Sequence, residues 1–316
     1  MSPKNIDVAL PFYKNNGEPA TGVISTPKQV AALKKLHRYI ESKEYSTMEL
    51  KCLCGNTDTK LDISIADRDR YGIPFKNVLC TKCGLVRAKH TLDDSSSAKF
   101  YRDLYRDIYT WGNLNEKRHI ERLFNEQVER GQRFIRKLNE QIGSLENINT
   151  ILEIGTGCGG NLYAFKNLGK KVVGCDFNKD YLQYGSEKGL DLRYGDLNSL
   201  DIIDSSQDLI ILSHVLEHFA NPIKELNSII KKISTNGYLL IEVPGILNLE
   251  SLYKNLLKYF QHAHTYNYSK QNLNILFTKL NLEVIYSDER CLCILRKPKN
   301  WIPIPTTTPI YSTELS

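Results

Sequence analysis

The sequence predicts an α/β protein: a doubly wound sheet of seven strands, with a small N-terminal metal-binding ribbon and a helical lid. Strands and helices alternate from Thr150 onward, which is typical of a parallel sheet with helices on both faces. The last two predicted strands, Leu282 to Asp288 and Cys291 to Leu295, are separated by two residues, a spacing that suits an antiparallel hairpin. Two pairs of closely spaced cysteines between positions 52 and 83 predict the ribbon.

Length and composition fit an ordinary soluble protein with more than one part. The 316 residues exceed an average domain, and 41% hydrophobic with 25% charged residues allow a sizeable core. We expect five parts: an N-terminal arm and helix (1–46), a zinc ribbon (47–95), a helical linker or lid (96–145), the main domain (146–298) and an extended tail (299–316).

The charge pattern and the cysteine content limit the partners and the compartment. The formal net charge of +6 is spread along the chain without a basic stripe, which disfavours nucleic acid as the partner. The N-terminus lacks a signal-peptide core and no apolar run is long enough to cross a bilayer, so we expect a cytoplasmic protein without a membrane span. Eight cysteines in that setting indicate metal binding and not disulfides. The pattern does not indicate an oligomeric state.

Two helices are predicted from end signals and periodicity. Thr26 and Pro27 fit an N-cap followed by a first helical residue, and the helix that they open runs to about Ser42. A longer helix is expected from Asn115 to about Ile142, because apolar residues recur along one of its sides. This long helix leads directly into the main domain.

A tyrosine stripe occupies the stretch between these two helices. Tyr101, Tyr105 and Tyr109 lie four residues apart within a predicted helical stretch, residues 92 to 113, and Trp111 follows. The stripe fits either an amphipathic helix packed on a core or a lid that closes over a ligand. The break around residues 109 to 112 is the better lid candidate.

The four cysteines of the ribbon have the spacing of a structural zinc site. Cys52 and Cys54 form the first pair, Cys80 and Cys83 form the second, and a glycine follows each pair. Two such loops can supply four thiolates to one Zn²⁺ in tetrahedral geometry, and a site with four protein ligands has no open position for chemistry. The alternative is four free cysteines in a small domain. We expect zinc in a folding role, with strand-like segments at 62–69 and 76–79.

A glycine-rich turn follows the first strand of the main domain. Four glycines between residues 155 and 160 join a predicted strand, Thr150 to Ile154, to a predicted helix, Asn161 to Leu168. Glycines let the backbone approach a ligand closely, and the helix start presents free N–H groups. Two templates fit: G-x-G-x-x-G of dinucleotide sites (Gly155, Gly157, Gly160) and acidic-x-G-x-G-x-G of S-adenosylmethionine (SAM) sites (Glu153, Gly155, Gly157, Gly159).

The remaining elements of the main domain continue the alternation of strands and helices. Asn236 and Gly237 give a C-cap signal for the helix before the fifth strand. The predicted strands are Lys171 to Cys175, Leu192 to Tyr194, Asp208 to Ser213 and Tyr238 to Val243, and the predicted helices are Lys179 to Lys188, Pro222 to about Ile233 and Ser269 to Leu280.

Residues at the strand ends favour SAM over a dinucleotide. Asp176, at the end of the second strand, suits the ribose of either ligand and does not discriminate. At the end of the third strand, the Asp196 carboxylate can accept from an adenine amino group while the Leu197 N–H reaches a ring nitrogen. The antiparallel hairpin is unlike the parallel sixth strand of a dinucleotide fold. The fourth strand opens into His214-x-x-Glu217-His218 where ligands bind in such sheets.

From residue 115 to about 297 the chain resembles the class I SAM-dependent methyltransferases. The segments that carry the resemblance are ILEIGTGCGG, VVGCDFN, YGDL, LIILSHVLEHF and GYLLIEVP, in that order. The resemblance implies a Rossmann-like fold and SAM as the cofactor. The expected cofactor-binding residues are Glu153, Gly155, Gly157, Gly159, Asp176, Asp196, Leu197 and Ser213.

The cysteines in front of this core are similar to those of bacterial methyltransferases of sugar and surface-glycan biosynthesis. Some sugar C-methyltransferases carry a four-cysteine zinc domain before the same core. That resemblance implies that Glu217 and His218 correspond to their acid–base pair and that Tyr109 lies near their lid tyrosine. The chain departs from them in its C-x-C first pair and in ending soon after the core.

The candidate base is a histidine near the end of the fourth strand. A sugar hydroxyl is a poor nucleophile, so a base must take its proton as attack develops. His218 is the first candidate, with Glu217 to orient it, and His264 on a later loop is the second. Alternatively, Glu217 and His218 cap the following helix, or His264 is polar surface. The motif also matches an inverted zinc-protease pattern, but its place after a buried strand argues against a protease.

Two function classes follow from this pattern. The first is methylation, at oxygen or carbon, of a small-molecule acceptor, a sugar or sugar nucleotide. The second is methylation of a macromolecule, RNA or protein, with the ribbon as a docking module. The absence of a basic stripe favours the first.

Overall fold

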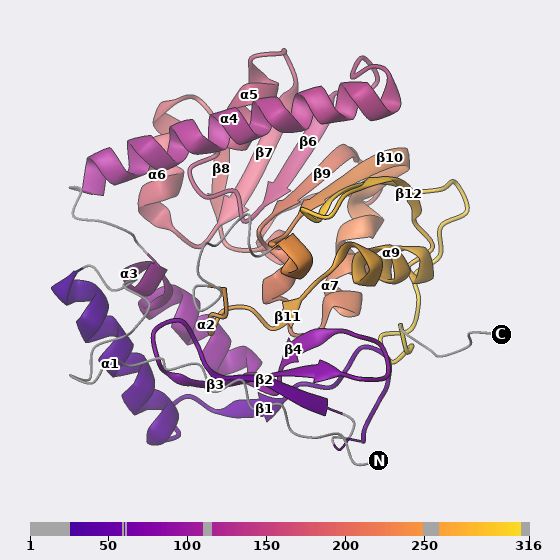
Figure 1. The fold of residues 1–316 in the computed structure, drawn as a ribbon. Coiled ribbons are helices and arrows are strands. Elements are labelled where there is room, and N and C mark those ends of the chain that lie inside the picture. The colour runs from indigo at the N-terminus through magenta and orange to yellow at the C-terminus, as the bar shows by residue number, and fades with distance from the viewer. Residues whose placement is uncertain (1–25, 59, 61, 110–115, 249–258, 311–316) are drawn as a thin grey trace.

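The computed structural model describes residues 26–58, 60, 62–109, 116–248 and 259–310. Figure 1 shows a large sheet with its helices, and a smaller unit of short strands and helices packed beside it. Three predicted features lie wholly or partly outside the described residues: the N-terminal arm (1–25), the lid break from residue 110 onward, and the last six residues of the tail.

The large sheet has the predicted doubly wound arrangement. Five strands are parallel, β13 is antiparallel to β10, and β12 is antiparallel to β13. The predicted seven-stranded α/β class with a closing antiparallel pair is therefore confirmed. In spatial order the strands are β12 (Glu283–Ser287), β13 (Leu292–Arg296), β10 (Ile233–Glu242), β9 (Gln207–Ser213), β6 (Thr150–Ile154), β7 (Lys171–Asp176) and β8 (Asp191–Tyr194).

Helices cover both faces of this sheet because successive strand residues point to opposite sides. Ile151 of β6 packs into a core with α4 (Glu116–Ile142) and α5 (Gly160–Lys166). Leu152, the next residue, packs into the opposite core. That second core contains residues of α7 (Pro222–Lys232) and α9 (Lys270–Lys279), and α6 (Lys179–Glu187) packs on β8 and β7. Figure 1 shows α4 lying across one whole side.

The predicted helix from Pro222 to about Ile233 is confirmed, but the C-cap signal assigned to Asn236 and Gly237 is wrong. Helix α7 ends at Lys232, and Asn236 lies inside β10 with a φ of 60°. The pairing of β10 with β9 is irregular between Ile233 and Tyr238, so the two turn residues form a bulge. Asn and Gly favour positive φ in a bulge as much as in a helix cap, which is why the sequence signal was ambiguous.

The ribbon is built from two small sheets, one of which includes a strand from the main domain. Strands β2 (Asp62–Arg68), β3 (Pro74–Cys80) and β4 (Val86–Ala88) form an antiparallel meander. The fourth strand is β11 (Tyr266–Asn267), which pairs with β4. A second pair joins β1 (Thr47–Glu49) to β5 (His90–Leu92). The ribbon and the main domain therefore share one sheet.

Three helices flank the ribbon. Helix α1 (Pro27–Glu41) begins at the predicted N-cap, where the Thr26 hydroxyl accepts from the backbone N–H of Gln29. The single helix expected over residues 92 to 113 is divided into α2 (Asp94–Asp103) and α3 (Tyr105–Tyr109). Leu104 separates them, with φ and ψ of −129° and −32° outside the helical range.

The segment after β13 crosses back to the ribbon. Ile310 is fully buried, and its backbone N–H donates to the Leu53 carbonyl at 2.6 Å, between the first two cysteines. Further back, the Trp301 indole donates to the carbonyl of Leu280 at the end of α9. The described part of the predicted tail is thus fixed to both units. Among the described residues, no helix has both the length and the apolar character needed to cross a membrane.

Candidate functional site

The glycine turn at the end of β6 forms the centre of the candidate site. Gly157 has a φ of 57°, and a Cβ there would lie 2.6 Å from the Gln127 amide nitrogen. A Cβ at Gly160 would lie 2.3 Å from the carbonyl oxygen of Phe124. Glycine is required at the first position by its backbone conformation and at the second by the close approach of the α4 backbone. The turn therefore presents bare backbone at the carboxyl edge of the sheet.

Glu153 lies beneath this turn and is fully buried. Its carboxylate accepts hydrogen bonds from the Thr156 hydroxyl at 2.8 Å and from the Asn161 amide at 2.6 Å. Burial raises the pKa of Glu153 to about 7, against the lowering effect of these two bonds. One carboxylate oxygen is thus bonded to the turn and the other to α5. The Glu153 carboxylate therefore holds the loop and the helix in place relative to each other.

Gln127 of α4 holds the turn from its other side and was missed in the sequence. Its amide nitrogen donates to the Thr156 carbonyl at 3.1 Å, and its amide oxygen accepts from the Gly160 N–H at 3.2 Å. A glutamine on a long polar helix gives no sequence signal. The contact depends on the docking of α4 onto the loop, which only the tertiary structure shows.

Asp176 lies at the carboxyl end of β7, beside the turn. Its carboxylate accepts from the backbone N–H groups of Gly157 at 2.9 Å and of Asn178 at 2.8 Å. Burial raises its pKa, although both bonds favour the ionised form. Asp176, the residue predicted to bind the ribose, therefore lies at the glycine turn. Backbone N–H groups hold its carboxylate in place.

Asp196 and Leu197 lie at the end of β8, as predicted. The Asp196 carboxylate is exposed and accepts from the backbone N–H groups of Asn198 and Ser199, so it caps a short 3₁₀ helix that begins at Leu197. Two exposed aromatic rings, Phe177 and Tyr194, meet edge-on with their centres 5.9 Å apart. Phe177 follows Asp176 in the chain, and Tyr194 is two residues before Asp196. An exposed aromatic pair next to two carboxylates offers a flat apolar surface for a base.

Ser213 ends β9 and connects to a charged network. The Arg130 guanidinium of α4 donates to its hydroxyl at 3.3 Å. Arg133 forms two bonds to the Glu242 carboxylate, at 2.8 and 3.0 Å, and the pKa of Glu242 stays low because this pairing outweighs its burial. His214 has a φ of 58° and lies between Glu242 and Glu217, 3.9 and 3.6 Å away.

The predicted catalytic residues are brought together beyond β9. Glu217 and His218 lie in a 3₁₀ turn, and His264 comes from the loop before β11. The Nε2 atom of His264 is 3.9 Å from Glu217 Oε1, and the rings of His218 and His264 have centres 5.1 Å apart. His218 Nδ1 lies 2.8 Å from the Ala263 carbonyl oxygen. This carbonyl can only accept, so Nδ1 carries the proton and Nε2 is left as an acceptor.

The loop that carries His264 is buried, contrary to the alternative of polar surface. His264 is 4% exposed and contacts the Gln261 amide nitrogen through Nε2 at 2.6 Å. Gln261 in turn accepts from the Arg70 guanidinium of the ribbon at 2.5 Å. Burial first, and then the neighbouring His218 and Arg70 side chains, hold the pKa of His264 well below its usual range. The neighbouring His262 stacks on Phe75 of β3 at 4.3 Å.

The tyrosine stripe faces this cluster even though its helix is broken. The three rings follow one another, with Tyr101 and Tyr105 centred 5.0 Å apart and Tyr105 and Tyr109 4.7 Å apart. His218 meets the first two edge-on at 6.0 and 6.1 Å. Burial, followed by the charges of Glu217 and Asp176, raises the pKa of Tyr105 above its usual range. Tyr105 is thus exposed to the charges of both Asp176 and the cluster around Glu217.

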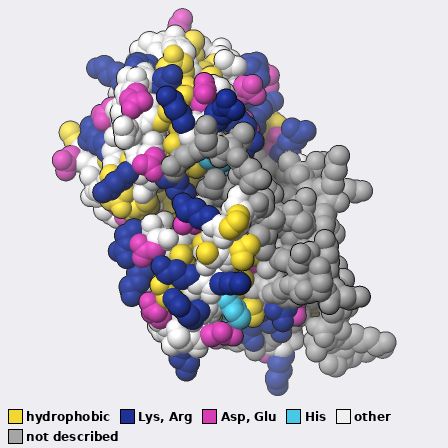
Figure 2. Space-filling model, turned by 90° about the vertical axis from the view of Figure 1, so that its left-hand side faces the viewer, with side chains coloured by type: hydrophobic (Ala, Val, Ile, Leu, Met, Phe, Trp, Pro, Cys, Tyr) yellow, Lys and Arg dark blue, Asp and Glu magenta, His cyan; other side chains and the backbone are white. Residues whose placement is uncertain are grey.

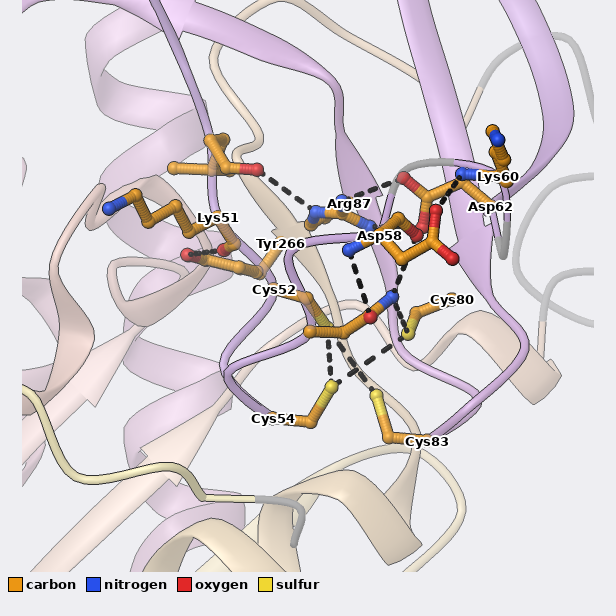
Figure 3. Close-up of polar contacts among 12 residues, drawn as sticks. Lys51, Cys52, Cys54, Asp58, Lys60, Asp62, Cys80, Cys83, Arg87 and Tyr266 are labelled. Carbon is orange, nitrogen blue, oxygen red and sulfur yellow. Dashed lines mark hydrogen bonds and ion pairs between the residues drawn. The ribbon is translucent and has the colours of Figure 1, made fainter.

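The four predicted zinc ligands converge at the edge of the ribbon (Figure 3). Sulfur–sulfur distances are 3.4 Å for Cys52–Cys54, 3.5 Å for Cys52–Cys83 and 3.8 Å for Cys54–Cys80. A tetrahedral ion with Zn–S bonds of about 2.3 Å requires about 3.8 Å between sulfurs, so the four thiols fit zinc. Close by, Arg87 forms two bonds to Asp62, and its charge faces the thiols.

A family model described as "Methyltransferase domain" matches residues 119–287. Solved structures also resemble the chain. A SAM-dependent methyltransferase from Archaeoglobus fulgidus is 24% identical over 52% of this chain and 74% of that one, with a TM-score of 0.41. One from Methanococcus maripaludis is 14% identical over 60% and 98%, with a TM-score of 0.44.

Two further solved structures extend the comparison. A putative methyltransferase from Haloferax volcanii, solved with the Trm112 methyltransferase activator, is 17% identical over 55% of this chain and 97% of that one, with a TM-score of 0.41. The chain spans 46% of the length of a Mesorhizobium loti methyltransferase that it matches at 20% identity and a TM-score of 0.28. No curated protein matches.

Proposed function

The chain belongs to the methyltransferase-domain family and is a SAM-dependent methyltransferase, and we propose that it methylates a sugar or sugar nucleotide with His218 as the base. The observation that carries this proposal is the orientation of His218. Its Nδ1–H is held by the Ala263 carbonyl, and its other nitrogen is left to accept a proton beside a row of three tyrosine rings.

The cofactor fits the carboxyl edge of the sheet. The glycine turn lets the protein backbone lie close to the ligand, and Asp176 at its side can accept from ribose hydroxyls. The exposed Phe177 and Tyr194, with Asp196 and Leu197, would hold the adenine. Glu153 acts in this proposal by holding the turn, and Ser213 by holding Arg130 near the methionine end. When bound, SAM supplies an electrophilic methyl group on a sulfonium.

The chain's own residues supply position and a proton acceptor. The Nε2 atom of His218 takes the proton of the acceptor hydroxyl as its oxygen attacks the methyl carbon and the carbon–sulfur electrons remain on sulfur. Glu217, one oxygen of which lies within 4.8 Å of a ring nitrogen of His218, stabilises the imidazolium that forms. The tyrosine rings offer apolar faces for the C–H groups of a sugar ring, and they exclude water from the reacting atoms.

The sugar acceptor is favoured over a macromolecule by the enclosure of the site. His264, Glu217 and Arg70 are all buried between the ribbon and the main domain, where a small molecule fits more readily than a folded one. On the face drawn in Figure 2, lysine and arginine side chains are interspersed with aspartate and glutamate, which gives no uniform basic surface for RNA.

The macromolecular alternative has one specific point in its favour. The Haloferax relative is a methyltransferase in complex with an activator protein, so a partner could be needed here as well. Radiolabelled SAM offered with a panel of nucleotide sugars, bulk RNA and cell protein separates the two. Label in a nucleotide sugar supports the proposal. Label only in RNA or protein, with or without an added activator, would refute it.

A further inference from the structure

Glu217 is a buried carboxylate in an unusual environment. Its side chain is 2% exposed, and neither oxygen has a hydrogen-bond partner among the described residues. Burying an ionised carboxylate without hydrogen bonds is costly, so this position requires a positive charge close by. The nearest candidates are the rings of His214 and His264, at 3.6 and 3.9 Å.

The ligand atoms around this carboxylate have the spacing of a metal site. One oxygen of Glu217 and one ring nitrogen each of His218 and His264 all lie within 4.8 Å of one another. His218 donates its Nδ1–H to a backbone carbonyl, which is the usual outer contact of a metal-binding histidine and leaves Nε2 free to bind. His264 is 4% exposed, and its Nε2 atom faces the Glu217 carboxylate at 3.9 Å.

We propose that Glu217, His218 and His264 form a second metal site, which binds a divalent transition ion of the zinc, cobalt or iron(II) class. Two imidazoles and one carboxylate suit such ions and leave coordination positions open. The ligands differ from the four thiolates of the ribbon, so the two sites are chemically distinct. The ion would supply the positive charge that the buried carboxylate requires.

One contact must change for the ion to bind. The Gln261 amide now lies 2.6 Å from Nε2 of His264, the nitrogen that faces Glu217. The same amide is 3.3 Å from Nδ1, so a small rotation moves it to the other nitrogen and frees Nε2. Arg70 holds the other end of this amide and remains in place.

The consequence for activity rests on the proposed function. His218 Nε2 is the atom that takes the proton in that proposal, so a bound ion and the base cannot use it together. The ion is therefore expected to inhibit methyl transfer.

Cobalt titration tests the site in the intact, zinc-loaded protein. Co²⁺ bound by Glu217, His218 and His264 should give visible ligand-field bands, without the sulfur-to-cobalt charge-transfer bands that thiolate ligation produces. We expect saturation at one ion per chain. Glu217→Gln and His264→Gln should each weaken this binding by more than about 10-fold, since even outer-shell changes cost 10–100-fold. His90→Ala, which removes an exposed histidine, is the matched control.

The outcomes separate the site from the proposed function. Inhibition that follows the cobalt spectrum supports the site and keeps His218 as the base. Activation that follows the spectrum also supports the site, and it removes the base role of His218. The site is overturned if no such bands form or if Glu217→Gln binds cobalt as well as the wild type. Unchanged turnover at a concentration that saturates the bands keeps the site and removes the base role of His218.

Discussion

His218 Nδ1 lies 2.8 Å from the carbonyl oxygen of Ala263, and this contact connects the candidate base to the four-cysteine ribbon. Ala263 is three residues before β11, the strand that completes the ribbon sheet. The backbone N–H of Ala88 in β4 donates to the carbonyl of Thr265, which continues the connection. The orientation of the imidazole thus depends on a strand pairing between the two units.

The first prediction concerns the base. His218→Ala should leave SAM affinity unchanged while turnover falls by roughly 10²–10⁴-fold, the usual contribution of general base catalysis. Glu217→Gln should cost less, because its role is supporting. Calorimetry with SAM and a methyl-transfer assay measure the two effects. If His264→Ala abolishes turnover while His218→Ala retains it, the base is on the loop.

The second prediction concerns the cofactor acid. Asp176→Ala should weaken SAM binding by about 1.5–3 kcal/mol, because it removes hydrogen bonds from ribose to a charged acceptor. It also removes the acceptor that holds the Gly157 N–H, so some loosening of the turn is included in that figure. Asp191→Ala, an exposed acid at the other end of the neighbouring strand, should bind SAM normally in the same calorimetric experiment. Equal affinities for wild type and Asp176→Ala would contradict the assignment.

The third prediction concerns zinc. Elemental analysis should find one zinc ion per chain, and Cys80→Ser should lose it and unfold at lower temperature, since structural zinc contributes roughly 10 kcal/mol of apparent folding energy in small domains. Because β11 pairs with the ribbon, residual folded protein should also show reduced turnover. Cys293→Ser, a buried cysteine of the main sheet, should lose stability and keep its zinc. Full zinc in Cys80→Ser would disprove the ribbon site.

The fourth prediction concerns pH. Burial lowers the pKa of His262 to about 4 from its ordinary 6.5, and neither ring nitrogen is hydrogen-bonded to a described residue. The unfolded chain therefore binds the extra proton first, so stability is present above pH 6.5 and is lost as the pH falls toward 4. Between pH 7.5 and pH 5, His262 should therefore lower the free energy of unfolding by about 2 kcal/mol.

His262→Phe should remove that acid sensitivity and keep the stacking on Phe75. Urea unfolding of both proteins at the two pH values measures the difference, with His37→Phe, an exposed histidine, as the control. An unchanged pH dependence in His262→Phe would show that other groups cause the loss.

The strands of the main sheet were predictable because their signals are local. Buried parallel strands form apolar runs, and Thr150–Ile154 was predicted to the residue. The break in the helix at Leu104 was not predictable, because the tyrosine periodicity continues across it and the rings of Tyr101 and Tyr105 stay in contact. The signal at Asn236 was interpreted as a helix cap because asparagine adopts a positive φ in helix caps and in β-bulges alike.

Within the candidate site, residues on the strand ends were foreseeable and those brought by packing were not. Glu217, His218 and Asp176 follow buried strands, so their convergence follows from the parallel topology. Gln127 and Arg70 come from elements far away in sequence, and nothing around them in the chain marks them. The two-residue strand β11 is too short to carry a periodic signal.

The shared sheet also determines how the protein can be divided. If residues 47–95 were produced alone, β4 would lose β11 and present an open row of backbone N–H and C=O groups, a template for pairing with another copy. An isolated ribbon is thus expected to self-associate through that edge even with zinc bound. Exchange of ribbons between related enzymes would succeed only if the loop from residue 259 to 268 were exchanged with them, since that loop carries the matching strand.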